Sequence, residues 1–197
     1  YLVINADESE PGTCKDRDIL RFEPQKLIEG CLITSYSISA HTCYIYIRGE
    51  YFREGQRLQE AINQSYQKNF LGKNACGSGW DLDIYLHYGA GAYICGEETA
   101  LIASIEGRRA EVDVRPPFPV TEGLYKKPTV VNNVETLSAA TGILLNGADQ
   151  FSSIGNKKSA GTELVCLDSF FKNPGNLFDK KGSPPTIRTN FNSDKSI

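Results

Sequence analysis

The stretch Gly89-Ala-Gly-Ala-Tyr-Ile-Cys-Gly-Glu-Glu-Thr-Ala-Leu101 decides how the rest of this chain is interpreted. An apolar run over 82–88 precedes it and predicts a strand, and residues 99–106 after it have the pattern of a helix. A strand, a glycine-rich turn and a helix in this order bring backbone N–H groups close to a bound cofactor. The stretch therefore predicts a cofactor-binding turn, although a glycine-rich turn alone is equally compatible with a tight connection.

Two adjacent carboxylates, Glu97 and Glu98, follow the last glycine of this turn. Negative charges suit the start of a helix, but they would repel a phosphate group placed there. One interpretation is that they cap a solvated helix. The other is that they accept hydrogen bonds from neutral donors, such as ribose hydroxyls, a nicotinamide amide or a flavin ring N–H.

A second loop rich in acceptor groups follows the apolar residues 2–4, which predict a short buried strand. It reads Asn5-Ala-Asp-Glu-Ser-Glu-Pro-Gly-Thr13. Open α/β sheets bind ligands at the carboxyl ends of their strands, where this loop would lie. The alternative is a solvated turn, because Pro-Gly is a strong turn signal. The mixed charges over 15–17 predict a salt-bridged surface segment.

The order of predicted elements is strand, helix, strand, helix, strand, helix. The helices are expected at about 24–38 and 51–68, and the strand between them at 42–47. This order predicts an α/β fold over 1–150, a Rossmann-like parallel sheet with flanking helices and right-handed crossovers. Both loops follow strands, so they should lie on the same edge of the sheet and form one site.

Two further segments belong to this picture. Asn132 and Asn133 precede a helix predicted from Val134 to about 145; one is expected to cap it, and both amides could pair with a ring edge. Arg115-Pro-Pro-Phe-Pro119 is too rich in proline for a helix and is expected to cover the sheet. Arg115 itself could meet a phosphate or lie on the surface.

Composition excludes several classes of protein. The formal net charge of −3 does not support nucleic-acid binding, and no apolar run approaches the roughly 20 residues of a membrane helix. The six cysteines contain no C-x-x-C pair, so metal-cluster spacing is absent and no metal ligand is predicted. A strand is expected over 161–167, and a polar, poorly ordered tail follows. The abrupt apolar start and the lack of Met predict an internal piece of a longer protein.

Three stretches together carry a resemblance to a family. They are Asn5–Arg17, Gly89–Leu101 and Pro128–Leu137. The chain resembles the NADH-binding flavoprotein subunit of respiratory complex I, with wording closest to the mitochondrial form around Cys14 and 72–79. The resemblance covers roughly 1–147 and implies a domain that holds FMN and takes a hydride from NADH.

The resemblance also implies a set of cofactor-binding residues. By motif position, the resemblance implies that the FMN site is lined by Asn5, Asp7, Glu8, Tyr93, Gly96, Glu97, Asn132 and Asn133. Glu10 and Glu98 match positions near NAD(H), and Arg115 stands where the family commonly has Lys. No residue is expected to act as a general acid or base, because hydride transfer needs none.

The chain departs from the family pattern at both ends. The family's N-terminal glycine-rich loop and its four-cysteine module for a 4Fe-4S cluster are missing, so no cluster ligands are expected here. Residues 160–197 resemble the start of a small β-grasp-like domain only weakly, through Asn173-Pro-Gly175. The chain alone is expected to be inactive in electron transfer.

The resemblance implies partners and a location. The partners are other complex I subunits, especially an adjacent iron–sulfur subunit, with no nucleic acid and no direct membrane insertion. The location is the matrix side of the mitochondrial inner membrane or the cytoplasmic face of a bacterial membrane. The alternatives are the diaphorase subunit of a soluble NAD-linked hydrogenase or formate dehydrogenase, and a non-catalytic structural remnant.

Overall fold

The computed structural model describes residues 1–167 and 175–180, which group into two compact units. The first unit contains Tyr1–Glu10 and Asp16–Thr141. The second contains Pro11–Lys15 and the described residues from Gly142 onward. The predicted boundary of the first domain near residue 150 stays a prediction. Its predicted α/β architecture is confirmed in the first unit.

A parallel sheet of four strands forms the centre of the first unit, in the order β3-β2-β1-β4. Its strands are β1 (Leu2–Ala6), β2 (Thr42–Ile47), β3 (Asp83–Tyr88) and β4 (Val130–Asn133). Leu2 lies opposite Cys43 on one side and opposite Val130 on the other. The fourth strand was not predicted, because four residues that end in two asparagines carry too little strand signal.

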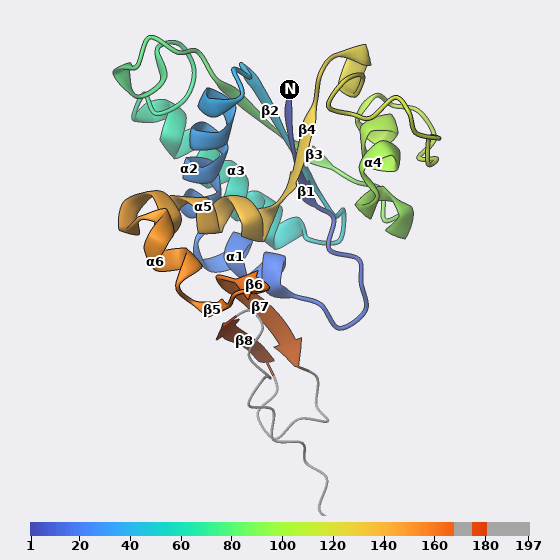
Figure 1. The fold of residues 1–197 in the computed structure, drawn as a ribbon. Coiled ribbons are helices and arrows are strands. Elements are labelled where there is room, and N and C mark those ends of the chain that lie inside the picture. Colours follow the sequence, from blue (N-terminus) through green and yellow to red (C-terminus); the bar gives the residue numbers. More distant parts are fainter. Residues whose placement is uncertain (168–174, 181–197) are drawn as a thin grey trace, which may run out of the picture. The chain divides into compact units, whose positions relative to one another are not determined.

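Helices cover both faces of this sheet (Figure 1). They are α1 (Lys15–Phe22), α2 (Pro24–Ser37), α3 (Phe52–Gln67), α4 (Glu98–Ile105) and α5 (Val134–Asn146). Short 3-10 turns occur at η1 (Ala75–Gly77), η2 (Tyr93–Gly96) and η3 (Leu124–Lys126). The predicted helices over 24–38, 51–68 and 99–106 are confirmed to within one or two residues.

The prediction of a salt-bridged surface segment over 15–17 is wrong for Asp16 but holds for Arg17. This segment forms the first turn of α1, and the side chain of Asp16 is buried. The interpretation failed because adjacent opposite charges are typical of a solvated surface, whereas here the acidic residue serves a helix N-terminus. Arg17 does pair with Asp18, at 3.5 Å.

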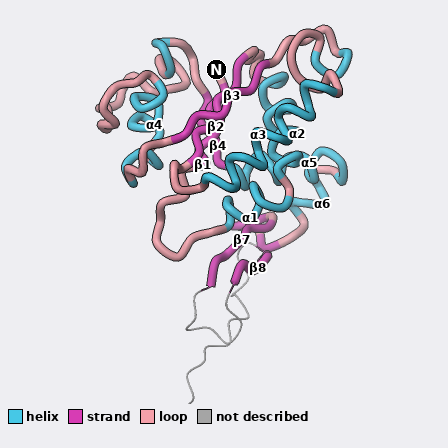
Figure 2. Tube along the Cα trace, turned by 180° about the vertical axis from the view of Figure 1, so that it is seen from behind, coloured by secondary structure: helices cyan, strands magenta, loops and turns pink. Residues whose placement is uncertain are grey.

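Alternation along β1 divides its side chains between two cores. Leu2 and Ile4 pack with residues of α2, α3 and α5, whereas Val3 packs with residues of α4. Figure 2, seen from behind, shows the same arrangement, with α2, α3 and α5 on one side of the strands and α4 on the other. Fully burying one such aliphatic side chain stabilises the fold by about 1.5–3 kcal/mol. The two cores therefore hold the sheet rigidly between layers.

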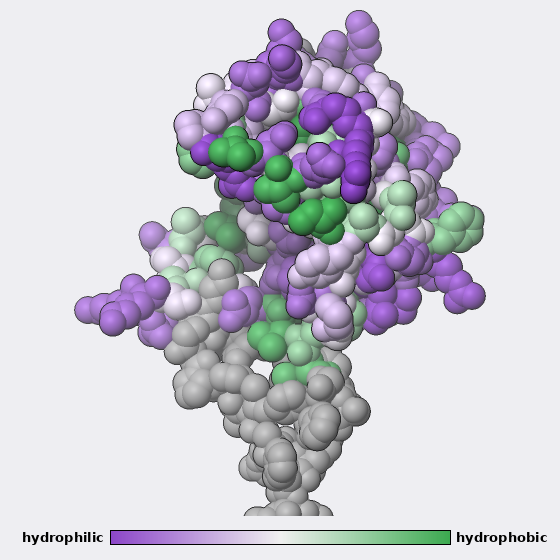
Figure 3. Space-filling model, turned by 90° about the vertical axis from the view of Figure 1, so that its right-hand side faces the viewer, coloured by the Kyte–Doolittle hydropathy of each residue, from purple (hydrophilic) through white to green (hydrophobic). Residues whose placement is uncertain are grey.

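The face that carries α4 exposes apolar side chains among polar ones (Figure 3). Ile94, Val114 and Val120 are all exposed, Val114 to 88%. Single exposed apolar residues are ordinary on protein surfaces. This face is therefore mixed in character.

The second unit contains short elements. They are α6 (Ala148–Ser152), β5 (Gly155–Asn156), β6 (Ser159–Ala160), β7 (Thr162–Leu167) and β8 (Gly175–Lys180). The strands pair antiparallel as β5 with β6 and β7 with β8. The predicted strand over 161–167 is confirmed, and the β-grasp-like assignment stays a prediction. Asn173 and the polar tail lie outside the described residues. Within the described part of the chain, no helix is long and apolar enough to cross a membrane.

Candidate functional site

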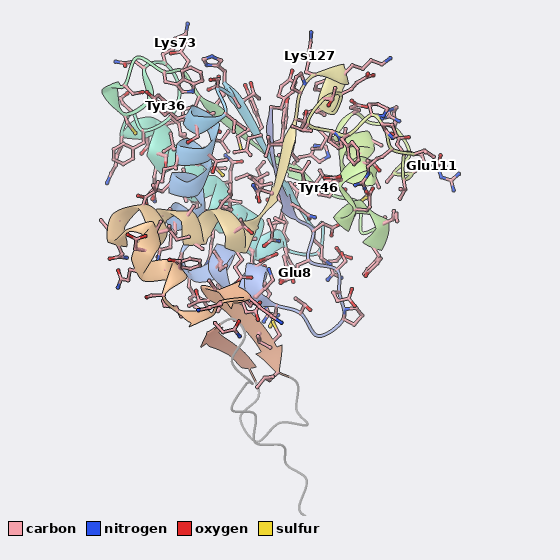
Figure 4. All side chains as sticks on the ribbon, in the orientation of Figure 1. Glu8, Tyr36, Tyr46, Lys73, Glu111 and Lys127 are labelled. Carbon is pink, nitrogen blue, oxygen red and sulfur yellow. The ribbon has the colours of Figure 1, made fainter. Side chains whose placement is uncertain are left out.

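The carboxyl edge of the first unit's sheet contains a topological switch point. The chain leaves β1 and crosses to β2 on one side, while β4 pairs with β1 on its other side. Open α/β sheets bind ligands in the crevice at such a point. Asn5 of β1 and Asn133 of β4 lie opposite each other there. Figure 4 shows Glu8 at this edge, with Lys73 and Lys127 at the opposite edge of the sheet.

Hydrogen bonds join the three predicted loops at this edge. The Asn5 side chain donates to the Gly96 carbonyl at 2.8 Å, which connects the acidic loop with the glycine turn. The Tyr93 hydroxyl donates to a carboxylate oxygen of Glu10 and makes a second connection between the same two loops. The Asn133 side chain donates to the Asn5 carbonyl at 3.4 Å. The prediction that the acidic loop and the glycine turn share one edge of the sheet is confirmed, and Asn133 joins them there.

The two asparagines of β4 have different roles. Asn133 caps α5, because its Oδ1 accepts from the Glu135 N–H at 2.9 Å, and its amide nitrogen donates to Asp16 at 2.8 Å. Asn132 makes no side-chain hydrogen bond with any described residue and is only partly buried. The prediction that one of the pair caps the helix is confirmed. No described residue uses the side-chain donor and acceptor of Asn132.

Glu8 is a buried carboxylate, only 6% exposed, that caps α1. Its two oxygens accept from the Asp16 N–H at 2.9 Å and the Arg17 N–H at 3.0 Å. The Tyr51 hydroxyl donates to it at 3.1 Å. Three donors on one carboxylate fix the path of the acidic loop. In this structure the Glu8 side chain therefore holds the acidic loop against the start of α1 and against Tyr51.

Glu97 and Glu98 share one cation. Arg115 donates to Glu97 and also reaches Glu98, at 2.7 Å. Glu97 also caps α4 by accepting from the N–H groups of Thr99 and Ala100 at 2.9 and 3.0 Å. The capping interpretation holds for Glu97, and Arg115 of the proline-rich segment offsets one of the two negative charges of the pair.

The pKa of Glu97 lies below its ordinary value. Burial opposes ionisation of this carboxyl, but hydrogen bonds from Thr99 and Ala100, together with Arg115, outweigh the burial. Glu97 is therefore a stable anion at neutral pH. Its charge is held at the edge of the sheet by a fixed network.

Asp7 behaves in the opposite way. Burial raises its pKa, and the hydrogen bond from Ser9 (2.6 Å) and the charge of Arg48 offset only part of that effect. Its backbone N–H donates to the Asn5 side chain at 3.1 Å, which closes a local turn. The side chain is half-buried at the carboxyl end of β1. The groups around ionised Asp7 therefore do not fully compensate for its burial.

The carboxyl end of β2 contributes residues that the sequence analysis missed. Arg48 donates to the Glu8 carbonyl at 2.9 Å and pairs with Glu50 at 3.1 Å. A Cβ on Gly49 would lie 2.3 Å from the carbonyl oxygen of Gly89, so the loops after β2 and β3 touch through their backbones. Arg48 and Gly49 directly follow a predicted strand, and that position is the signal by which they could have been identified.

Tyr46, labelled in Figure 4, lies on the α4 face of the sheet behind the edge. It is fully buried, its hydroxyl bonds Ser104 at 2.9 Å, and its ring stacks on His87. Burial raises its pKa well above the ordinary value. Tyr46 therefore stays neutral and anchors β2 to α4.

Several donors and acceptors near this edge are partly or fully exposed. Asn132 offers an amide, Glu10 and Asp7 offer carboxylate acceptors, and Tyr93 offers an aromatic ring that is 62% exposed. Gly91, at φ +85°, keeps the turn free of side-chain bulk. Among the described residues, no group of three or more His, Cys, Asp or Glu side chains could hold a metal ion.

Comparison with known proteins gives consistent matches. A family model described as the Nuo51 FMN-binding domain matches residues 1–141. An NADH-quinone oxidoreductase subunit of Rickettsia typhi is 55% identical over 184 residues, which cover 93% of this chain and 44% of that protein. The corresponding protein of Rickettsia felis is 56% identical over 182 residues, covering 92% and 43%. The chain thus spans less than half the length of these curated relatives.

Solved structures agree with the sequence matches. A crystal structure titled as an NAD+-reducing [NiFe]-hydrogenase in the H2-reduced state superposes with a TM-score of 0.83 at 39% identity. The air-oxidised state gives a TM-score of 0.81 at the same identity. Each match covers 91% of this chain and 30% of that chain. The parallel sheet and its flanking helices therefore recur in a protein that handles a nicotinamide cofactor.

Proposed function

The chain belongs to the family of the Nuo51 FMN-binding domain, and on that premise we propose that it holds FMN at the carboxyl edge of β1 and β4. The observation that carries this proposal is the convergence of three loops through Asn5, Gly96 and Asn133. The flavin ring would lie against this junction, and the ring edge would meet Asn132. Asp7 and Glu97 would accept hydrogen bonds from the hydroxyl groups of the ribityl chain.

The parent protein would be an NADH-oxidising subunit of an NADH-quinone oxidoreductase. When bound, FMN supplies the chemistry by accepting a hydride from NADH and releasing electrons singly. The chain's own residues provide position and charge. Tyr93 offers a ring face beside Glu10, and Glu10 and Glu98 would contact the nicotinamide nucleotide. No side chain needs to move a proton, so the site requires no catalytic acid or base.

Arg115 sets the charge of the site. It offsets one of the two negative charges of Glu97 and Glu98, which would weaken their repulsion of an anionic cofactor. A planar guanidinium can hold both carboxylates at once, which a lysine in the same position could not do with the same geometry. Arg115 would thereby keep the glycine turn compatible with a nucleotide.

We also propose the larger assembly in which the parent protein works. Electrons would pass to an iron–sulfur chain in the parent protein and its adjacent iron–sulfur subunit, and on toward quinone. The complex would lie on the matrix side of the mitochondrial inner membrane or on the cytoplasmic face of a bacterial membrane. The curated relatives, which are named as subunits of NADH-quinone oxidoreductase, support this assignment.

The test compares two asparagine variants of the natural protein that contains this chain. Asn132→Ala removes a side chain that makes no hydrogen bond with the described residues, so folding should be unaffected. Asn63→Ala is the matched control, because Asn63 is exposed on α3. Losing one hydrogen bond, worth about 1 kcal/mol, should raise the FMN dissociation constant roughly fivefold. Equal flavin content and equal NADH–ferricyanide activity in both variants would contradict the proposed site.

A second candidate is the diaphorase subunit of an NAD-linked hydrogenase. The superposition on the NAD+-reducing [NiFe]-hydrogenase favours it, since the same domain occurs there. Both candidates place FMN at the same edge, so they differ only in partner subunits. Purification of the natural complex separates them: quinone-linked subunits support the first, and hydrogenase subunits the second. A flavin-free natural protein would indicate a structural remnant.

A further inference from the structure

Two cysteine side chains that are far apart in sequence meet inside the second unit. Cys14 lies directly before α1, and Cys166 lies in β7, 152 positions later. Their sulfur atoms are 3.9 Å apart, and the Cys14 N–H points at the Cys166 sulfur at 3.1 Å. Both residues are partly exposed, and both are thiols in this structure. The two sulfurs are therefore close to each other in residues that are not fully buried.

We propose that Cys14 and Cys166 form a reversible disulfide, a modification site within the second unit. A disulfide bond is about 2.05 Å long, so the two sulfurs need to approach by roughly 1.9 Å. Rotations about the side-chain bonds of partly exposed residues can supply that movement. Cys31, Cys43 and Cys95 are buried, which leaves this pair as the accessible neighbours among the described cysteines.

Two local features favour the reaction. The N–H of Cys14 donates to the Cys166 sulfur, which stabilises negative charge on that sulfur. Cys14 precedes the start of α1, where the helix dipole stabilises negative charge. Thiol oxidation proceeds through the thiolate, so each feature assists the step that begins it.

The oxidant we assign is a hydroperoxide, and the step balances. One thiolate attacks the peroxide oxygen, the O–O bond breaks, and a sulfenic acid and water form. The second thiol then attacks the sulfenic sulfur, an S–S bond forms, and a second water leaves. Overall, two thiols lose two electrons and two protons, and one hydrogen peroxide becomes two waters. A small dithiol reverses the reaction by becoming a disulfide itself.

The bond would restrain a particular part of the chain. Pro11–Lys15 is the covalent connection between Glu10 and Asp16, and the disulfide would tie it to β7. Register places Cys166 opposite Asn176 of β8, so the tether ends on a strand that is itself paired. The oxidised form should therefore be more compact in this segment than the reduced form.

The experiment uses the chain with Cys76→Ser, because Cys76 is exposed and could link two molecules. The folded protein is titrated with hydrogen peroxide, free thiols are alkylated, and unreduced tryptic peptides are analysed by mass spectrometry. We expect a cross-linked species joining the peptide that ends at Lys15 to the peptide 159–172. Its mass should be about 2 Da below the sum of the two thiol peptides, and dithiothreitol should remove it.

Controls make the result decisive. Cys14→Ser and Cys166→Ser, each in the same background, should abolish the cross-link while far-ultraviolet circular dichroism and the thermal melt of the whole chain show that the fold is kept. Denaturation in urea before peroxide treatment should lower the yield of this particular cross-link at least severalfold. The proposal is overturned if both cysteines stay open to alkylation in the folded protein. It is equally overturned if they oxidise separately to sulfinic acids, or if the cross-link forms as readily in urea.

Discussion

Replacing Glu8 by alanine should destabilise the first unit far more than any other single change in the acidic loop. The side chain is 6% exposed, and its carboxylate accepts from two backbone N–H groups at the start of α1 and from the Tyr51 hydroxyl. Alanine leaves these three donors without their acceptor and removes the charge that faces the helix dipole.

The magnitude follows from these contacts. A hydrogen bond to a charged group contributes about 1.5–3 kcal/mol, and losing a helix cap costs about 0.5–2 kcal/mol. Water entering the vacated space will restore part of the loss, so we expect a net destabilisation of about 2–5 kcal/mol. Since domains are stable by only about 5–15 kcal/mol, this is a large share. Glu8→Gln keeps the shape and one acceptor oxygen, and should cost about 1–2 kcal/mol.

Urea unfolding followed by Trp80 fluorescence is a suitable assay, because the chain has one tryptophan and it lies in the first unit. Glu10→Ala is the control, since Glu10 belongs to the same loop but is exposed and should change stability by no more than about 0.5 kcal/mol. If Glu8→Ala and Glu10→Ala unfold within about 0.5 kcal/mol of each other, the capping role assigned to Glu8 is refuted.

Three further substitutions test the packing and charges of the first unit. Gly30→Ala places a Cβ 2.3 Å from a backbone oxygen of α5, so overpacking that costs about 1–3 kcal/mol should outweigh the helix-propensity gain of about 1 kcal/mol. Gly142→Ala is the control, because its Cβ would meet nothing and the substitution should be stabilising. Equal melting temperatures of the two variants in thermal melts would refute the close contact at Gly30. Burial raises the pKa of Asp7, so the protonated form favours folding and stability is lost as pH rises through the folded-state value. Asp7→Asn should then be the more stable protein at pH 7, with a difference that disappears below about pH 4 in urea titrations, and a constant difference would contradict the burial argument. Arg115→Gln should raise the pKa of Glu97, because the variant lacks the cation that favours the ionised carboxyl. Ionised Glu97 stabilises the fold at pH values above the pKa of the unfolded chain, and this contribution is lost on acidification. Carbon NMR titration of the Glu97 carboxyl measures the change, and an unmoved midpoint would exclude the ion pair.

Most of the sheet could be predicted because its signals are local. The β-branched and aromatic run of β2 and the alternation of β3 each report strand geometry within six residues. Pro24 at a first helical turn announces α2 in the same way. The strand β4 escaped prediction because its four residues become a strand only by pairing with β1. Tertiary pairing, which no local pattern records, made that element.

Among the site residues, residue type was predictable but use was not. An acidic loop at the end of a strand predicts hydrogen-bond acceptors. Only the tertiary structure shows that both carboxylate oxygens of Glu8 accept from N–H groups of α1. It also shows that the side chain of Asn132 makes no hydrogen bond with a described residue. Likewise the sequence presents Arg115 as a phosphate contact or a surface residue. The structure places it between Glu97 and Glu98.

By itself the sequence determined the class of fold and the chemistry on offer, because hydrophobic periodicity, turn residues and acceptor-rich loops are properties of short stretches. It also predicted that the loops share one edge, because parallel strands that succeed one another all end on the same side. Only the tertiary structure decided which loops touch, which carboxylates are buried, and that Cys14 meets Cys166, since these depend on how distant segments pack. Local sequence specifies elements and their ends, whereas contacts between distant segments arise from packing the whole chain at once.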